Sequence, residues 1–358
     1  MTTAERSESP ATRTPFEIAF GLWLGLGPAA TGFVVAGCLS AGALLFHWIV
    51  ASGAVRLDEF VSLGFATRAA LIASVATGYV FFATRFGAIG GLQDVRELGL
   101  APDLDPSDES PAYETPPEAM ARGRRAAGLG VVFFLIVLEI PNWSAGAGLF
   151  GAWRSLHVLA YLQLVGLLFF WVSGRAAFLS LRAMRSLAGI AEGNLDIDLF
   201  DLTPLSVFGR AAARNCLLWL VSFSIGSLVF LNPELSFRES LIVFVPVFIV
   251  IVTIAGLALW LPLRSVHARV SARKTEELAK IDAALRGDRE ALLASRIQHW
   301  TPDVGLADLL SYRRYVADIR TWPFEGPTLG RVALFILIPI GSWVGGALVE
   351  RAVEAALR

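Results

Sequence analysis

The sequence predicts an all-α fold: a polytopic bundle of about seven transmembrane helices with helical extensions on the cytosolic side. Hydrophobic residues make up 55 % of the 358 residues and charged residues only 17 %, whereas a soluble domain carries about 25 % charged residues. Segment 241–263 has no charged residue and no polar stripe that could form the solvent face of a soluble helix. Arg and Lys also alternate between rich and poor loops along the chain.

A helix that crosses a bilayer needs about 20 mostly apolar residues. Seven segments are read as such spans: 29–51, 69–84, 126–143, 156–171, 215–231, 241–263 and 329–349. The apolar stretch that starts at Phe16 is expected to lie at the membrane interface. Basic residues are frequent after the second, fourth and sixth spans and rare in the alternate loops. Cytosolic loops are the basic ones, so we expect a cytosolic N-terminus and an external C-terminus from Glu350, in a bacterial inner membrane.

The spans divide the chain into alternating membrane and cytosolic parts. In order, these are a disordered cytosolic tail 1–15, spans one and two in 16–85, a cytosolic loop 86–125, spans three and four in 126–174, a cytosolic linker 175–214, spans five and six in 215–263, a cytosolic helical segment 264–327, and span seven with the external C-terminus in 328–358. Within the first loop, 92–98 has the spacing of a short amphipathic helix. The stretch 101–118 is rich in Pro, Asp and Glu, a composition that is typical of a disordered linker.

The linker 175–214 is predicted to form a helix, a connector and a second helix. Apolar residues recur at helical spacing up to Ile190, so the fourth span is expected to continue into the cytosol and end near Gly193, which suits a helix C-cap. Leu or Ile alternates with Asp in 195–199, which indicates a short extended piece. Pro204 is expected to begin the helix that enters the fifth span.

The stretch SLAGIAEGNL, residues 186–195, resembles the end of the first helix and the Gly-Asp/Asn-Leu connector of a HAMP linker. The resemblance covers about residues 179–210. HAMP linkers join transmembrane helices to cytosolic signalling domains, so the resemblance implies a role in signalling. The chain departs from the HAMP pattern because its second helix leads back into the membrane and not into a kinase or chemoreceptor domain.

The segment 264–327 is predicted to form three helices. The first leaves the sixth span and ends at Gly287, Asp288 caps a second helix that runs to Ile297, and the third covers 307–320. The first of these helices has charged faces: Glu276 and Glu277 lie three or four residues from Lys280, a spacing that supports an exposed helix. We interpret the segment as a solvated helical platform; a surface that docks a partner is the alternative.

Three ionisable residues are the candidates for chemistry inside the membrane. Glu139 lies near the outer end of the third span, and Arg154 and His157 open the fourth span across a short loop. Ionisable groups within a bilayer are functional candidates because their burial is costly. A contact of Glu139 with Arg154 or His157 would serve proton coupling or a solute site. The alternative is a polar staple that holds the helical hairpin together.

Two further groups of residues are assigned structural roles. Gly341, Gly345 and Gly346 would let the seventh span approach another helix closely, within the bundle or in a homo-oligomer. Trp322 and Phe324 precede that span and are expected to act as interfacial anchors.

The sequence offers no catalytic, cofactor-binding or metal-binding motif. It contains no GxxxxGK[ST], HExxH or GxSxG motif, its four His are scattered, and its net charge of −1 indicates no nucleic-acid partner. We therefore expect a non-catalytic membrane scaffold or sensor whose cytosolic helices contact a cytosolic or membrane protein. The alternative is a transporter or channel for a small solute or ion, and a membrane enzyme is third.

Overall fold

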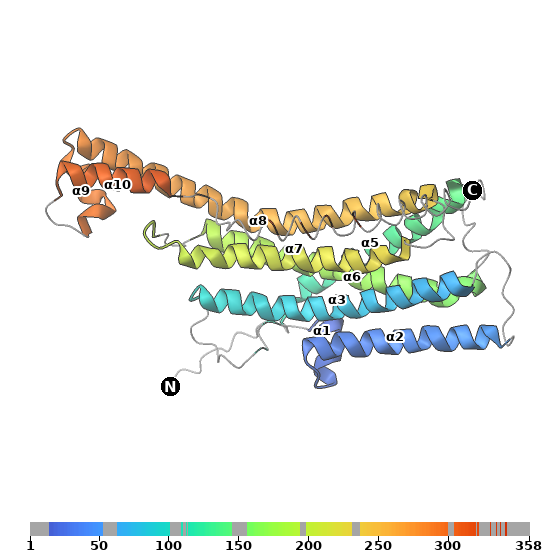
Figure 1. The fold of residues 1–358 in the computed structure, drawn as a ribbon. Helices are drawn as coiled ribbons and strands as arrows, with labels where there is room; N and C mark the ends of the chain where they lie inside the picture. Colours follow the sequence, from blue (N-terminus) through green and yellow to red (C-terminus); the bar gives the residue numbers. More distant parts are fainter. Residues whose placement is uncertain are drawn as a thin grey trace, which may run out of the picture.

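The computed structural model describes residues 14–52, 63–100, 114–144, 156–193, 198–230, 237–299 and 304–319, together with single positions within 109–112 and 321–341. These residues form an all-helical fold (Figure 1). Its α-helices are α1 (Phe16–Trp23), α2 (Pro28–Ala51), α3 (Leu63–Glu97), α5 (Pro117–Ser144), α6 (Leu156–Glu192), α7 (Ser206–Ser227), α8 (Phe237–Leu285), α9 (Arg289–Ala294) and α10 (Leu306–Asp318). Short 3₁₀ helices are η2 (Thr203–Leu205), η3 (Leu228–Phe230) and η4 (Arg296–His299).

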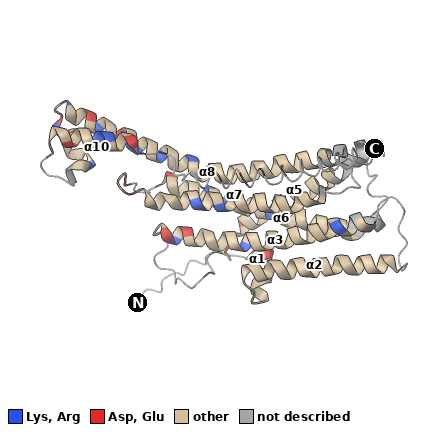
Figure 2. Ribbon diagram, viewed as in Figure 1, with Lys and Arg blue, Asp and Glu red and all other residues tan. Residues whose placement is uncertain are grey.

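The long helices run side by side (Figure 1). α2 packs on α3, α3 on α6 and α7, α5 on α6, and both α6 and α7 on α8. At one end of this bundle α8 extends beyond its neighbours and carries α9 and α10. Charged residues gather at this end (Figure 2). We call it the charged end; it comprises 85–97 of α3, 175–192 of α6, 206–215 of α7, 264–285 of α8, and the helices α9 and α10.

Four helices are long and apolar enough to cross a membrane: α2, α3 from Thr67, α6 from Tyr161 and α8 from Phe244. They overlap the predicted spans 29–51, 69–84, 156–171 and 241–263. α2 has no charged residue and leaves large apolar side chains uncovered, with Phe33 79 % and Trp48 66 % exposed. Such a face suits contact with lipid or another protein better than contact with water.

The structure does not support the prediction of seven spans. The predicted spans 126–143 and 215–231 are helical parts of α5 and α7, but these helices are not among the four. In α7 the polar residues Arg210, Arg214 and Asn215 occupy the first half, so its apolar part is short. The first turns of α5 hold Glu118, Arg122, Arg124 and Arg125. The predicted seventh span, 329–349, lies outside the described residues except for single positions.

α3, α6 and α8 are all longer than the spans they contain. α3 continues to Glu97, so the separate helix predicted at 92–98 is wrong; this part of α3 is tied to α7 by ion pairs, and the helix has no reason to break before it. α8 runs for 49 residues through Pro246 and Pro262, which confirms the prediction that the helix of the predicted span 241–263 continues beyond it.

The helices at the end of the chain follow the prediction closely. α8 ends before Gly287, whose φ of 93° is one that glycine adopts without strain. Asp288 then caps α9, because its carboxylate accepts hydrogen bonds from the backbone N–H groups of Glu290 and Ala291 at 3.0 and 3.1 Å. Together with 264–285 of α8, the helices α9, η4 and α10 form a small unit that we call the platform.

The platform shares its core with the charged ends of α6 and α7. Met184 and Leu187 of α6, Phe208 of α7, Val270 and Ile281 of α8 and Tyr312 and Val316 of α10 belong to one buried cluster. A second cluster, with Val172 of α6 and Trp219 and Leu220 of α7, lies among the candidate spans. The platform is therefore packed onto the bundle and does not hang from it on α8 alone.

Candidate functional site at the charged end

A buried ion pair joins α1 to α6. The Glu17 side chain is fully buried, and its Oε1 lies 3.5 Å from Nε of Arg175, which is 7 % exposed. Neither carboxylate oxygen accepts a hydrogen bond with normal geometry. The Arg175 guanidinium also lies 5.9 Å from the centre of the Trp171 ring and donates to the Met120 sulfur. Loss of either partner would leave an uncompensated buried charge, which costs about 3–5 kcal/mol.

Further polar contacts tie α3 to its neighbours at the charged end. Arg214 of α7 binds the Asp94 carboxylate with two nitrogens, and Arg210 binds Glu97. Arg85 of α3 donates to the carbonyl oxygen of Leu26, in the turn between α1 and α2. The charged end is thus cross-linked from α1 through α3 to α7.

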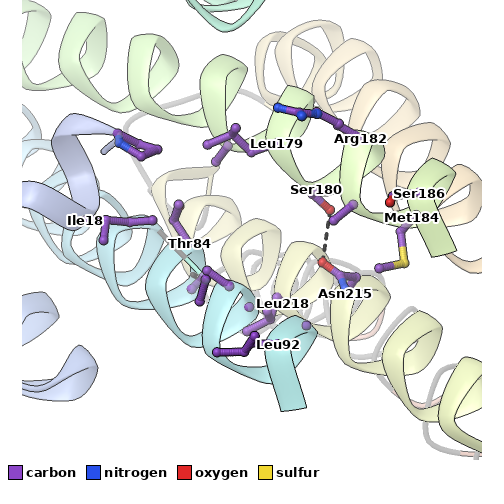
Figure 3. Close-up of a pocket in the computed structure, with 18 of the residues that line it drawn as sticks. Ile18, Thr84, Leu92, Leu179, Ser180, Arg182, Met184, Ser186, Asn215 and Leu218 are labelled. Atoms are coloured by element: carbon purple, nitrogen blue, oxygen red, sulfur yellow. Dashed lines mark hydrogen bonds between the residues drawn. The ribbon is translucent and has the colours of Figure 1, made fainter. Parts of the chain in front are cut away.

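A cavity of about 450 Å³ lies between α3, α6 and α7 in this layer. Figure 3 shows Ile18 of α1, Thr84 and Leu92 of α3, and Leu179 of α6 around an open space. Most of the lining is apolar. Ala112, Glu114 and Thr115 complete the wall.

The polar groups of the cavity come mainly from α6 and α7. Ser180 donates to Asn215 Oδ1 at 3.1 Å and receives a hydrogen bond from Trp219 Nε1 at 3.3 Å (Figure 3). Arg182 lines the same cavity and is half-buried. The Ser180–Asn215–Trp219 chain is satisfied internally, whereas the Arg182 guanidinium has no acidic partner within the part of the chain that the structure describes.

Glu277 organises the platform. Its side chain is 5 % exposed, and Oε1 accepts hydrogen bonds from Ser295 Oγ at 2.7 Å, from the Arg296 backbone N–H at 2.9 Å and from the Tyr312 hydroxyl at 3.1 Å. These donors belong to the α9–η4 junction and to α10. One carboxylate of α8 therefore holds both other parts of the platform.

The connector between α6 and α7 is also attached to the platform. Asp198 accepts from Arg296 at 2.9 Å, and the Phe200 ring stacks on Tyr312 and Tyr315 with centroid distances of 5.4 and 5.6 Å. At the end of α6, Glu192 accepts from Ser265 of α8 at 2.7 Å. The end of α6, the connector and α8 are therefore fixed to one another.

The structure brings together other residues than those the sequence singled out. Of Glu139 and His157 only the helical backbone is described, and Arg154 lies outside the described residues, as do Trp322, Phe324, Gly345 and Gly346. At Gly341, a single described helical position, an added Cβ would meet no described atom within 4 Å. In the described helices, close approaches occur at Gly32 with Gly78, and at Gly130 and Gly174, where an added Cβ would collide with backbone atoms of the facing helix.

The prediction that Glu276 and Glu277 both lie on an exposed face is half wrong. Glu276 is exposed and accepts from Lys280 at 2.8 Å, as expected. Glu277 is buried because it shares a helix face with Val270, Lys274 and Ile281, at steps of three or four residues. This spacing in the sequence could have predicted the burial of Glu277. No local pattern could have predicted the burial of Glu17, since its partner Arg175 is far away in the sequence.

The comparisons do not supply a family for this arrangement. No protein-family model, no characterised protein and no solved structure matches the chain. Among the described residues, no three His, Cys, Asp or Glu side chains are grouped so that they could hold a metal ion. The function therefore has to be argued from the geometry alone.

Proposed function

We propose that the chain is a multi-pass protein of a bacterial inner membrane, with its N-terminus and its charged end in the cytosol. The four candidate spans, the uncovered apolar face of α2 and the excess of basic residues on one side support this location. α5 and α7 lie alongside these four, and we extend the proposal to them and to 329–349, which gives about seven spans.

Within this membrane setting, the chain acts as a non-catalytic sensor or scaffold whose platform contacts a protein partner. The observation that carries the proposal is the single helix α8, which joins a candidate span to the carboxylate of Glu277 without a break. A continuous helix can carry a tilt or rotation from the span to the platform. The described part of the connector, 198–205, is fixed to the platform at Asp198 and Phe200, and this supports the interpretation of the segment as a HAMP-like linker.

Breaking α8 between its two parts tests the proposed coupling. Ala268 is exposed, so Ala268→Pro removes no packed side chain but disrupts the helix by about 3 kcal/mol. Ala268→Gly costs only about 1 kcal/mol and is the matched control. With a photocrosslinking residue at Ser311 of α10 in native membranes, we expect one stoichiometric adduct in the wild type and in Ala268→Gly, and a strong loss in Ala268→Pro. If the wild type gives no stoichiometric adduct, the proposal is wrong.

The cavity favours transport of a small solute as the second candidate function. A solute path would have to connect the cavity with Glu139 at the other side of the bundle. Solute flux into proteoliposomes that falls in Glu139→Gln would support transport. Flux that is the same in Glu139→Gln and the wild type would remove this residue from the path.

A further inference from the structure

We propose that the cavity between α3, α6 and α7 is a binding site for one amphiphile with a single long acyl chain and an anionic head group. The inference rests on the proposed membrane location, because such molecules partition into bilayers. It does not depend on the proposed coupling through α8. Neither the motifs of the sequence nor the ion pairs of the charged end account for this cavity.

The cavity exists because α3 presents small residues to α6 and α7. Ala83, Gly87, Ala88 and Gly91 follow one another at helical spacing along its wall. A Cβ at Gly87 would be 3.7 Å from Leu218, and a Cβ at Gly91 would meet nothing within 4 Å. Protein interiors contain few voids larger than a water molecule. A space of about 450 Å³ falls instead within the range of ligand pockets, about 300–1,000 Å³.

The apolar walls fit a hydrocarbon chain. Ile18, Leu92, Leu179 and Leu218 come from four different helices and surround the space (Figure 3). Water beside these apolar walls would find few partners, since the hydroxyl and amide groups of Ser180 and Asn215 already bond each other. An acyl chain makes no such demand.

Arg182 specifies the charge of the head group. Three other arginines that reach across this layer have acidic partners: Arg175 has Glu17, Arg210 has Glu97, and Arg214 has Asp94. Arg182 lines the cavity, and no such partner for it is found in the described residues. Ser186, one turn further along α6, adds a hydroxyl to the same wall. Glu114 also lines the cavity, but it is exposed to solvent, where its charge is screened.

The position of the cavity along the helices suits a ligand that enters from the bilayer. Its lining on α3 runs from Val80 to Val95, from the candidate span into the charged end, and its lining on α6 runs from Ala176 to Ile190. A carboxylate or a phosphate head would lie toward the charged end and the chain toward the bilayer. A free fatty acid and a single-chain phospholipid share this chemistry.

Native mass spectrometry of the full-length protein in detergent tests the site. The probes are oleate, oleoyl-lysophosphatidylglycerol and, as an uncharged match, oleyl alcohol. Gly91→Leu fills the cavity, and Gly37→Leu places the same side chain on the exposed side of α2, where nothing lies within 4 Å. Arg182→Gln removes the charge, and Arg185→Gln is its control at an exposed position of α6 outside the cavity.

We expect one anionic probe molecule per chain in the wild type and in both controls. Gly91→Leu should abolish this occupancy. Arg182→Gln should weaken binding of the anionic probe by about tenfold, the effect of one charged hydrogen bond, and leave oleyl alcohol unchanged. Preference for oleate or for the lysolipid identifies the source of the ligand. If Gly91→Leu does not fold, Gly91→Ala replaces it in the binding test. This variant adds only one methyl group and should keep the wild-type melting temperature.

Two results would overturn the proposal. One is the absence of a bound probe in the wild type. The other is equal occupancy in Gly91→Leu, or in Gly91→Ala at limiting probe, and in the control Gly37→Leu. Failure of the proposed coupling is seen separately, as an adduct at Ser311 that Ala268→Pro leaves intact while oleate still binds.

Discussion

Two adjacent carboxylates of α8 show how strongly a position on the helix decides the role of a residue. Glu276 faces solvent and pairs with Lys280, a type of contact that contributes about 0–1 kcal/mol. Glu277 is turned inward by one residue and accepts three hydrogen bonds in a nearly water-free site. The same functional group is thus dispensable at one position and central at the next.

Replacement of these two residues should therefore have unequal effects. Glu277→Ala leaves the buried donors of Ser295, Arg296 and Tyr312 without an acceptor and should destabilise the platform by about 2–4 kcal/mol. Amide hydrogen exchange in α9 and α10 measures this as a loss of protection. Glu276→Ala is the control and should leave exchange in both helices nearly unchanged. Equal protection in the two variants would contradict the role given to Glu277.

Tyr312 should make the attachment of α10 sensitive to alkaline pH. Burial, together with the neighbouring Glu277 carboxylate, raises the pKa of Tyr312 above its ordinary value of 10.0. A group whose pKa is raised by folding stabilises the fold fully below its unfolded pKa, and this stabilisation is lost as the pH rises through the folded value. We expect the stability of the platform to fall only above pH 10.0.

The tyrosinate absorbance during an alkaline titration, taken as the difference between wild type and Tyr312→Phe, measures this ionisation. The difference signal should appear at higher pH than the signal of the denatured protein. Tyr312→Phe removes the ionisable group, so its platform should lack this component of the pH dependence. A difference signal centred at 10.0 or below would show that the hydroxyl is not held as described.

At the scale of whole helices, contacts between glycines determine how closely two helices approach each other. Gly78 of α3 faces Gly32 of α2, and an added Cβ would lie 2.4 Å from the Gly32 carbonyl oxygen and 2.7 Å from Ala36 Cβ. Small residues allow helix backbones to come together in this way. From the sequence, such contacts were predicted at Gly341, Gly345 and Gly346. Glycines are also present in α2 and α3, but hydropathy does not show which glycine of one helix faces which glycine of another.

Enlargement of Gly78 should separate α2 from α3. Gly78→Ala introduces a methyl group where no space exists, and overpacking of this kind costs about 1–3 kcal/mol. The fraction of protein that survives heating in detergent, measured by size-exclusion chromatography, should fall. Gly37→Ala is on the same helix pair but meets nothing within 4 Å, so it should be neutral or slightly stabilising. The same loss in both variants would exclude a steric cause.

Helix ends were more predictable than helix neighbours. Gly287 and Asp288 have strong local preferences, for a positive φ and for an N-cap, and the structure uses both. The spacing in 92–98 predicted a helix there, but its continuity with the rest of α3 had no local signal, because it depends on the pairing of Asp94 with Arg214, far along the chain. The count of seven spans rested on apolar runs and on the alternation of basic loops, and in α7 the arginines at its start shorten the apolar run.

At the scale of the whole molecule, the proposed orientation places α10 and the end of α2 on opposite sides of the membrane. The natural cysteines are both free, Cys38 on the exposed side of α2 and Cys216 in the core, so Cys38→Ser with Cys216→Ser provides a background for labelling. In intact cells an impermeant maleimide should label Ser52→Cys at once and Ser311→Cys only after permeabilisation. Labelling of Ser311→Cys in intact cells would reverse the orientation.

The class of fold could be predicted from composition, but the candidate site could not. Apolar runs without charge predict helices that suit a membrane, whatever their order in space. The cavity depends on which face of α3 meets α6 and α7, and the buried Glu17–Arg175 pair joins the first helix to a much later one. Such contacts depend on the packing of the whole chain, which no local pattern of Glu17 or Gly91 reveals.

The Glu17–Arg175 pair also has a consequence for biosynthesis. The chain is made from its N-terminus, so α1 leaves the ribosome before α2, α3 and α5, and long before Arg175 exists. Until α6 has been made, the carboxylate of Glu17 lacks the counter-charge that it has in the folded chain. The ion pair that joins α1 to α6 can therefore form only after α2, α3 and α5 have been made.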